Sequence, residues 1–293
     1  MEFDLEHLDL CVNDVCLHLV RAGPPGGRLV ILLHGFPEFW YGWRKHIHPL
    51  VEAGYNVLVP DQRGYNVSEK PPGVRNYQVD VLAKDVVDLV DMFEQEKAVL
   101  VGHDWGGVVA WETALRYPER LEKLVILNAP HPDVMTRFLF SSLEQLRRSW
   151  YIFFFQIPGF PEWLLGRNKF AALRNTVSSH GNPGSIGNTD LLEYIGAWSQ
   201  PKALKSMLNW YRAAFRRGVR GPWKADKIDL RRVSVATLML WGMKDSALSH
   251  RLAQPSIDLC DLGRLVFFEN ASHWLQHDEA DAVNSQLLDF LHS

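Results

Sequence analysis

Short runs of consecutive apolar residues recur along the chain and alternate with segments that have helical periodicity. The runs lie at 28–35, 56–60, 97–103, 123–130 and 235–242. They are too short and too continuously apolar for surface helices, and the pattern is typical of strands buried on both faces of a parallel sheet. Between two of them, residues 79–96 carry apolar side chains on one recurring helical face. The alternation predicts an α/β fold, in which helices flank a mostly parallel, twisted sheet.

The first residues show a different, alternating pattern. Residues 3–20 alternate between polar and apolar positions around Asn13 and Asp14, which predicts an antiparallel hairpin at one edge of the sheet. The segment is acidic and has no basic and apolar leader pattern, so we expect no secretory signal. The most apolar later stretch, 149–165, is interrupted by prolines and polar residues, and we therefore expect no membrane span.

The alternation of predicted strands and helices stops between about 132 and 222. This segment has no clean parallel-strand run and is rich in aromatic residues and arginine. We interpret it as a helical cap inserted over the carboxyl edge of the sheet. The chain would then consist of a core, residues 1–131 and 223–293, and a cap, residues 132–222. Four arginines near the end of the cap are predicted to form a solvated helix face: Arg212, Arg216, Arg217 and Arg220.

Composition excludes several classes of function. The 293 residues are 47% hydrophobic and 22% charged, which is typical of a globular enzyme domain. The formal charge of −3 gives no field for binding a nucleic acid. The three cysteines, Cys11, Cys16 and Cys260, are few and odd in number. We therefore expect three buried free thiols, no disulfide framework, and a cytoplasmic protein in a reducing compartment.

Polar or glycine-rich motifs adjoin the predicted strands and the last predicted helix. In chain order they are HGFPEFW at 34–40, DQRGYNVS at 61–68, GHDWGG at 102–107, GMKDSAL at 242–248 and ASHWLQHD at 271–278. Active sites in open α/β sheets form beyond the carboxyl ends of the strands. We therefore expect these motifs to meet at one edge of the sheet.

The chain order of three residues suggests nucleophilic catalysis. Asp104, Asp245 and His273 follow the order nucleophile, acid, base, with an aspartate where a serine is usual. An ionised carboxylate needs no base to become a nucleophile. His273 and Asp245 are therefore left to activate water for hydrolysis of the resulting ester. The backbone N–H groups of Phe36 and Trp105 are predicted to form the oxyanion hole of that step.

The same five motifs resemble, in order and over essentially the whole chain, those of the epoxide hydrolases of the α/β-hydrolase superfamily. The resemblance implies an α/β-hydrolase fold and the conversion of an epoxide and water into a vicinal diol, without a cofactor or a metal. It also implies that two cap tyrosines hydrogen-bond the epoxide oxygen, and Tyr151 and Tyr211 match their positions. Opening an epoxide develops negative charge on oxygen, which phenol donors stabilise.

The aromatic side chains of the predicted cap favour an apolar, aryl- or alkyl-substituted epoxide as the small-molecule substrate. Four residues are predicted to bind it: Trp105, Phe154, Phe155 and Pro37. The sequence leaves the oligomeric state, including a homodimer, open.

Alternative functions stay open at this point. A haloalkane or haloacid dehalogenase would use the same aspartate and histidine, with Trp105 as a halide-binding residue. A non-catalytic ligand-binding protein of the same fold is a second alternative, although the complete set of candidate groups argues against it. At the level of residues, Asp104 could instead cap a helix, and His277 and Tyr194 are alternatives to the predicted base and phenols. An esterase is excluded because no serine elbow follows a predicted strand.

Overall fold

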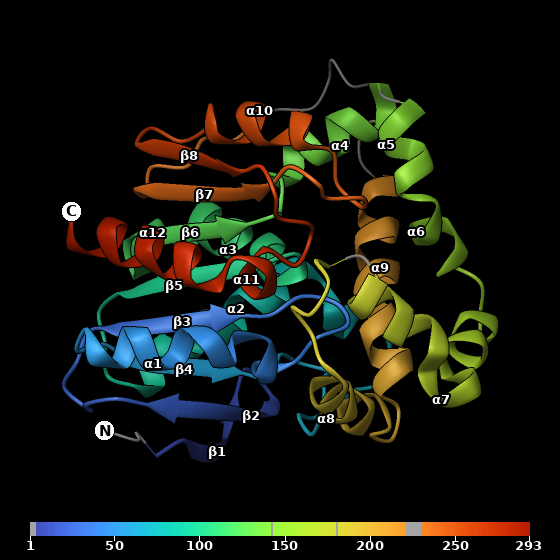
Figure 1. The fold of residues 1–293 in the computed structure, drawn as a ribbon, viewed down its shortest axis with the longest axis horizontal. Coiled ribbons are helices and arrows are strands. Elements are labelled where there is room, and N and C mark those ends of the chain that lie inside the picture. The colour runs from blue at the N-terminus through green and yellow to red at the C-terminus, as the bar shows by residue number, and fades with distance from the viewer. Residues whose placement is uncertain (1–3, 142, 180, 221–229) are drawn as a thin grey trace.

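The computed structural model describes residues 4–141, 143–179, 181–220 and 230–293 of the chain. Its centre is an eight-stranded sheet with the strand order β1-β2-β4-β3-β5-β6-β7-β8 (Figure 1). The six strands from β4 to β8 in this order pair in parallel, and β2 is antiparallel to both of its neighbours. The predicted fold class, α/β with a mostly parallel sheet, is confirmed. The strands are β1 (Glu6–Val12), β2 (Val15–Ala22), β3 (Leu29–Leu33), β4 (Asn56–Pro60), β5 (Ala98–His103), β6 (Leu121–Leu127), β7 (Thr237–Gly242) and β8 (Gly263–Phe268).

The five apolar runs form the strands β3 to β7. Every residue of β3, β4, β5 and β7 is buried, as expected for strands covered on both faces. The sequence pattern did not reveal β8, whose residues are exposed or only partly buried. This strand lies at the edge of the sheet, where continuous burial is not required.

The hairpin of β1 and β2 forms as predicted, with Asn13 and Asp14 at positive φ in its two-residue turn. Its register places Cys11 opposite Cys16, and these two exposed residues form a disulfide. The prediction of buried free thiols is therefore wrong for both, because a two-residue turn makes the residues on either side of it cross-strand neighbours. Cys260 is free and buried, as predicted. The cysteines consequently give no support to a reducing compartment.

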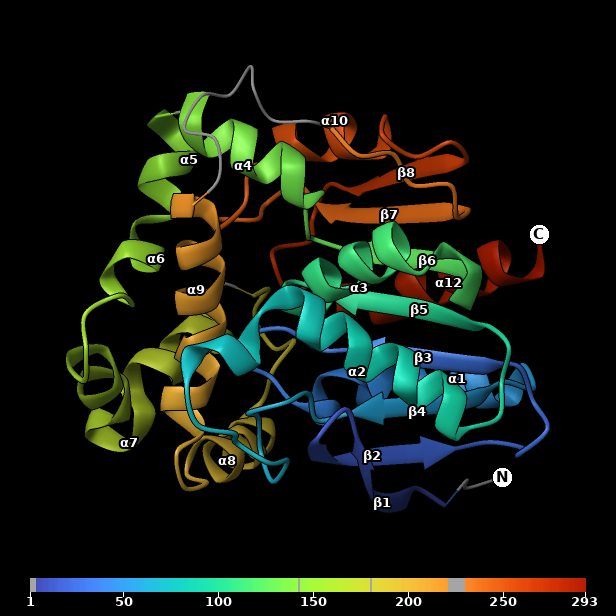
Figure 2. The ribbon, with the colours of Figure 1, turned by 180° about the vertical axis from the view of Figure 1, so that it is seen from behind.

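Helices cover both faces of the sheet. They are α1 (Arg44–Glu52), α2 (Val79–Met92), α3 (Trp105–Arg116), α10 (Ala253–Ile257), α11 (Leu275–Asp278) and α12 (Ala280–His292), with the 3-10 turns η1 (Trp40–Trp43), η2 (Val74–Tyr77), η3 (Pro118–Arg120) and η5 (His250–Leu252). Figure 1 shows α1 and α12 in front of the sheet, and Figure 2 shows α2 and α3 on its other face. Side chains of β3 alternate between two cores: Val30 and Leu32 join that of α1 and α12, and Ile31 and Leu33 that of α2 and α3.

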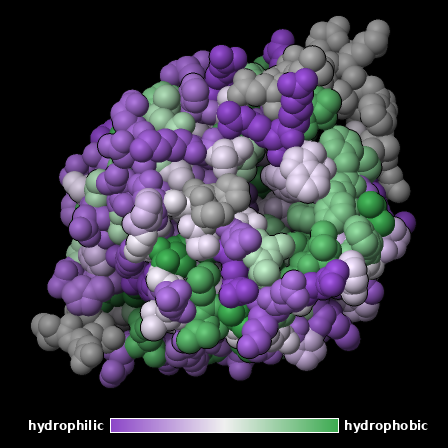
Figure 3. Space-filling view, turned by 45° about the vertical axis from the view of Figure 1, so that its right-hand side comes forward, coloured by the Kyte–Doolittle hydropathy of each residue, from purple (hydrophilic) through white to green (hydrophobic). Residues whose placement is uncertain are grey.

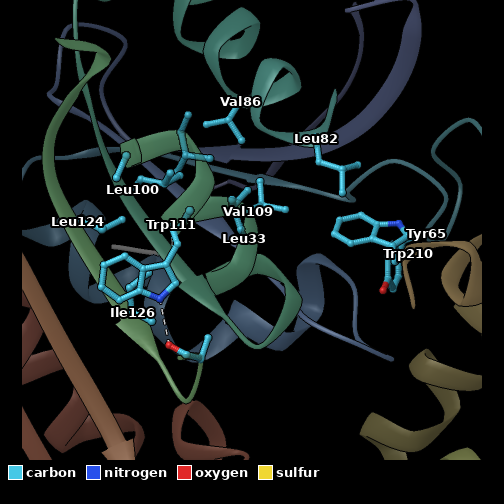
Figure 4. Close-up of a cluster of buried hydrophobic side chains, with 14 of the residues drawn as sticks. Leu33, Tyr65, Leu82, Val86, Leu100, Val109, Trp111, Leu124, Ile126 and Trp210 are labelled. Carbon is cyan, nitrogen blue, oxygen red and sulfur yellow. Dashed lines mark hydrogen bonds between the residues drawn. The ribbon is translucent and has the colours of Figure 1, made fainter. Parts of the chain in front are cut away.

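The core beneath α3 fixes the start of that helix (Figure 4). Trp111 is fully buried in one cluster with Leu124 and Ile126 of β6. Its indole N–H donates a hydrogen bond of 3.1 Å to the carbonyl oxygen of Ala129, so its only polar atom is satisfied. The helix α3, which begins directly after Asp104, is thereby held against the sheet.

A group of helices lies between β6 and β7 in the chain. Figures 1 and 2 show it beside the carboxyl ends of the parallel strands. The division into core and cap stays a prediction, and its boundary between 222 and 223 lies outside the described residues. No helix in the described ranges is long and apolar enough to cross a membrane. The helices are α4 (Pro132–Ser141), α5 (Leu143–Arg148), α6 (Trp150–Phe154), α7 (Phe160–Ser179, interrupted by non-helical backbone at 167–170), α8 (Asn188–Trp198) and α9 (Ala203–Arg220).

The arginines of α9 do not all face solvent. Arg212 is buried, pairs with Glu162 at 2.7 Å, and donates to two backbone carbonyl groups between α6 and α7. The predicted solvated face is therefore wrong for Arg212, because that side of α9 packs against α6 and α7. Arg216 and Arg217 are exposed. The side chain of Arg220 lies outside the described residues.

Candidate active site

Asp104 lies at the turn between β5 and α3. Its φ of 50° and ψ of −118° are rare for a residue with a side chain, and glycines on both sides permit them. A Cβ on Gly102 would stand 2.4 Å from the carbonyl oxygen of Gly106, and one on Gly106 would stand 2.2 Å from that of Leu33. The Asp104 side chain makes no capping hydrogen bond to α3, so the helix-cap alternative has no support.

Asp104, His273 and Asp245 meet at this turn. Nδ1 of His273 lies 2.7 Å from Oδ2 of Asp245, and its Nε2 lies 3.6 Å from Oδ2 of Asp104. The side chain of Asp245 is 1% exposed, whereas that of Asp104 is 18% exposed. His273 therefore bridges a buried carboxylate, which orients it, and an accessible carboxylate, which can react.

Asp245 is held by hydrogen bonds that the sequence analysis did not foresee. The Asn128 side chain donates to Oδ2 of Asp245 at 2.7 Å, and the N–H groups of Ala247 and Leu248 donate to Oδ1 at 2.8 Å each. Asn128 also accepts from the N–H of Gly242 at 3.1 Å, which links the ends of β6 and β7. The sequence signal that could have identified Asn128 is a polar residue directly after a buried strand.

Burial and charge act in opposite directions on these groups. Burial lowers the pKa of His273, but the Asp245 and Asp104 carboxylates raise it well above its usual value. Burial raises the pKa of Asp245, but the charge and hydrogen bond of His273 hold it below its usual value. The two carboxylates beside His273 therefore favour the protonated form of its imidazole.

One backbone donor already contacts the reactive carboxylate. The N–H of Phe36 donates to Oδ1 of Asp104 at 2.8 Å. This approach requires Gly35, because a Cβ there would stand 2.4 Å from the Cβ of Asp104. Trp105, the other predicted donor, is the first residue of α3, and within the described residues its N–H makes no hydrogen bond to the Asp104 carboxylate. The geometry thus provides the Phe36 half of the predicted oxyanion hole.

Tyr151 of α6 and Tyr211 of α9 come together above this carboxylate. Their ring centroids lie 5.8 Å apart, and the Tyr211 ring also meets Trp105 edge to face at 4.9 Å and Phe36 at 5.3 Å. Burial, and then the charge of Asp104, raise the pKa of both phenols. Both tyrosines therefore stay protonated at neutral pH and can donate hydrogen bonds.

Two of the four residues predicted to bind substrate contact these phenols, since the rings of Phe155 and Trp105 lie 5.0 Å and 4.9 Å from that of Tyr211. Pro37 follows Phe36 and is buried, and its carbonyl oxygen accepts a hydrogen bond of 2.6 Å from a tryptophan of α8. The result is an aromatic enclosure around Asp104.

The fourth residue, Phe154, points to the other side of α6. Its ring lies 5.8 Å from Trp150 and 5.9 Å from Phe160, which are both exposed. Within the described residues its only ring contact toward the site is with Phe155, at 5.9 Å. A direct contact of Phe154 with substrate therefore stays a prediction without support from this geometry.

His277 and Tyr194 belong to a second buried network. Nε2 of His277 and the hydroxyl of Tyr194 each lie 2.6 Å from Oε1 of Glu38. Gln276 donates to Oε2 of Glu38 at 2.8 Å, and Nδ1 of His103 lies 3.5 Å from the same oxygen. Burial raises the pKa of Glu38, but the neighbouring histidines hold it well below its usual value. Glu38 was not predicted to have a role, although this residue lies in the first motif, at 34–40. Despite these many ionisable groups, no three among the described residues are arranged to hold a metal ion.

Comparisons with known proteins show the family and the fold of this chain. The family model of the alpha/beta hydrolase fold matches residues 28–280. The AB hydrolase superfamily protein YfhM of Bacillus subtilis is 44% identical over 279 residues, which cover 95% of each chain. Epoxide hydrolase 4 of Homo sapiens is 39% identical over 307 aligned positions, covering 98% of this chain and 82% of that protein.

A solved epoxide hydrolase structure has the same fold. A mutant of an epoxide hydrolase from Bacillus megaterium, complexed with its product (R)-3-[1]naphthyloxy-propane-1,2-diol, superposes with a TM-score of 0.86. The two chains are 28% identical, and the superposition covers 98% of this chain and 100% of that one.

Proposed function

This chain belongs to the α/β-hydrolase fold family and, within it, to the epoxide hydrolases, and from that premise we propose that it converts an epoxide and water into a vicinal diol through an ester on Asp104. The observation that carries the proposal is the placement of His273, whose ring nitrogens lie 2.7 Å from Asp245 and 3.6 Å from Asp104. The reactive carboxylate is thus separate from the group that can activate water.

In the first step, Oδ2 of Asp104 attacks one epoxide carbon and the bond from that carbon to the epoxide oxygen breaks. The oxygen takes up the electron pair and receives a proton from Tyr151 or Tyr211. The raised pKa of these phenols means that they release the proton only to a strong base, such as the developing alkoxide. Oδ1 of Asp104 stays bound to the N–H of Phe36, so Oδ2 is the oxygen available for attack.

In the second step, water cuts the ester. Ester formation neutralises Asp104 and removes one of the two charges that raise the pKa of His273. The imidazolium can then return a proton to the tyrosinate, and neutral His273 takes a proton from water as it attacks Cγ of the ester. The oxyanion forms on Oδ1, where the Phe36 N–H stabilises it. The bond from Cγ to Oδ2 breaks, the departing oxygen takes the proton held by His273, and the diol leaves with Oδ2. The carboxylic acid left at Asp104 then passes its proton to His273, which restores the starting state.

The aromatic enclosure supports an apolar, aryl- or alkyl-substituted epoxide as the substrate. The rings of Phe36, Trp105 and Phe155 each contact the ring of Tyr211, whose pKa the nearby Asp104 charge helps to raise after burial. Such surfaces bind apolar groups by burying apolar surface area and through edge-to-face ring contacts. The Bacillus megaterium relative, whose product is a naphthyl ether diol, supports the same class.

A substrate panel tests the proposal. Styrene-type epoxides, aliphatic epoxides and haloalkanes are each incubated with the wild type and with Asp104→Ala, and diol and halide are both quantified. We expect diol from epoxides with the wild type and none with Asp104→Ala. Halide release without diol formation would assign the chain to the dehalogenase alternative. The dehalogenase has less support, because the Trp105 ring that would bind halide packs against Tyr211.

Two further proposals concern the protein as a whole. One is a cytoplasmic location, for which the disulfide between Cys11 and Cys16 does not argue. The other is a homodimer, and light scattering of the purified protein measures the oligomeric state directly.

A further inference from the structure

Large apolar side chains are exposed in a continuous row along the outer side of α6 and α7. Ring contacts link part of the row. Phe160 lies 5.6 Å from Trp163, and the half-buried Phe154 contacts both Trp150 and Phe160, at 5.8 Å and 5.9 Å. Figure 3 shows an extended apolar patch on the side of the molecule formed by these helices. We call the row the cap ridge. Its members are each between 38% and 62% exposed: Trp150, Phe153, Ile157, Phe160, Trp163 and Leu164.

The cap ridge is not needed to close the hydrophobic core. The same helices bury their opposite side, where Phe155, Leu165 and Leu173 are each less than 9% exposed. Single exposed apolar residues are common, but a contiguous row of this kind marks a surface that meets a partner or a membrane.

A groove of about 650 Å³ runs beside the cap ridge, between α7 and α9. Exposed cations line its α9 side: Lys202, Lys205 and Arg216. In the part of the chain that the structure describes, Glu162 is the one acidic residue of the lining, and it is paired with the buried Arg212 at 2.7 Å. The uncompensated charge of the groove is therefore positive.

A further cation stands at the end of the cap ridge. The guanidinium of Arg167 lies 4.5 Å from the centre of the Trp163 ring. The same surface thus combines exposed tryptophan and phenylalanine rings with arginine and lysine side chains. This composition is typical of protein surfaces that lie in the interface of a lipid bilayer.

We propose that the cap ridge and the cationic groove dock this protein on an anionic lipid membrane surface. The rings would enter the boundary between headgroups and acyl chains, to a depth of about 5–10 Å. Lys202, Lys205 and Arg216 would meet the headgroup phosphates. This docking goes beyond the proposed reaction and does not depend on it.

Charge favours a membrane over a second copy of the chain as the occupant. A twofold pairing through the cap ridge would bring the cationic grooves of two copies to one interface. No exposed acidic side chain among the described lining residues is available there to pair with them. An anionic bilayer is complementary to the same cations.

Vesicle flotation with the whole protein tests this docking. The protein is mixed with vesicles of phosphatidylcholine alone, or with one quarter phosphatidylglycerol, at low and at high salt. We expect binding to the anionic vesicles to be at least about tenfold tighter than to the neutral ones, and to weaken at high salt.

Two double variants separate the apolar and the cationic contributions. Phe160→Ser with Trp163→Ser removes part of the cap ridge, and Lys202→Glu with Lys205→Glu inverts part of the groove. The matched control is Leu262→Ser, at an apolar residue before β8 that is more exposed than Phe160 and Trp163. We expect flotation to fall at least about tenfold in both double variants and to be unchanged in the control. Melting temperatures establish that each variant is folded, and the four single variants replace any double variant that is not.

Three results would overturn the inference. If the wild-type protein does not float with anionic vesicles, the cap ridge and the groove do not dock on an anionic membrane. If the cap-ridge variant floats as well as the wild type, the membrane contact lies on another surface. A wild-type dimer that the cap-ridge variant dissociates would assign this surface to a second copy of the chain.

Discussion

The imidazole of His273 is placed for the second half of the reaction and not for the first. It lies between Asp245 and Asp104, and their charges raise its pKa well above the usual value. Attack by Asp104 needs no base, because the carboxylate is the reacting group. Hydrolysis of the ester does need one, since water must lose a proton as it adds.

Replacing His273 should therefore separate the two steps. In His273→Gln we expect Asp104 to be alkylated and the ester to accumulate, with diol turnover reduced by about 10³-fold or more. Mass spectrometry of the peptide that contains Asp104 should show the mass of one added substrate. Asp104→Ala, treated identically, should show no adduct. An unmodified peptide in folded His273→Gln that has been given a wild-type substrate would contradict this role.

The two phenols act on the other step. Removing one hydroxyl, in Tyr151→Phe or Tyr211→Phe, should slow ester formation by about 10²-fold and leave ester hydrolysis unchanged. Tyr77→Phe is the control, because its hydroxyl is bonded to the carbonyl of Pro71. Stopped-flow single turnovers resolve the two rates. Slower hydrolysis with normal ester formation would assign the phenols to a different step.

At the scale of elements, two turns bring Asp104 and its donor together. The turn after β3 carries Gly35 and Phe36, and the turn after β5 carries Asp104. The N–H of Phe36 reaches Oδ1 of Asp104 at 2.8 Å because Gly35 has no side chain. Contact between these turns, more than either turn alone, sets the position of the reactive carboxylate.

A methyl group at Gly35 should separate the turns. In Gly35→Ala the added Cβ would stand 2.4 Å from the Cβ of Asp104, and we expect kcat to fall by about 10²-fold as the carboxylate is displaced. Gly26→Ala is the matched control, since its Cβ would meet no atom within 4 Å. Steady-state kinetics on one epoxide measure both variants. Equal activity of the two would mean that the close approach is not required.

Among the parallel strands, the sequence predicted those whose burial is continuous or nearly so. The runs that become β3, β4, β5 and β7 are fully buried, so their apolar pattern is unbroken. β8 was missed because an edge strand tolerates exposed residues. The predicted catalytic residues come together at the carboxyl ends of these strands, although their roles are still proposals.

Residues that act through long-range contacts could not be predicted. Asn128 and Glu38 are defined by partners more than a hundred positions away, namely Asp245 and His277. No local pattern encodes such pairs. The error at Cys11 and Cys16 has a different cause, because the predicted two-residue turn at Asn13 and Asp14 itself places the two cysteines opposite each other.

At the scale of the whole molecule, the site should make stability depend on pH. The folded pKa of His273 lies above its ordinary value of 6.5, so its contribution is full below about pH 6.5 and is lost as the pH rises through the folded pKa. Asp245 has the opposite sign, because its folded pKa is lowered from 3.8. Its contribution is present above that value and is lost as the pH falls through the folded pKa.

Urea unfolding measures this dependence. We compare the wild type with the double variant His273→Gln and Asp245→Asn, which removes both titrating groups and leaves no unpaired charge in place of Asp245. The difference in the free energy of unfolding should be largest between about pH 4 and pH 6.5 and should decline as the pH rises toward the alkaline range. A difference that stays constant from about pH 6 to pH 10 would contradict the assigned pKa of His273.

The covalent ester on Asp104 is the central claim, and a single turnover in ¹⁸O-labelled water tests it most directly. With enzyme in excess over epoxide, the diol should contain only ¹⁶O, because its new oxygen comes from Oδ2 of Asp104. The label should appear in the peptide that contains Asp104, since water attacks Cγ of the ester. Label in the diol from the first turnover, with an unlabelled Asp104 peptide, would show that water attacks the epoxide itself and would contradict the account.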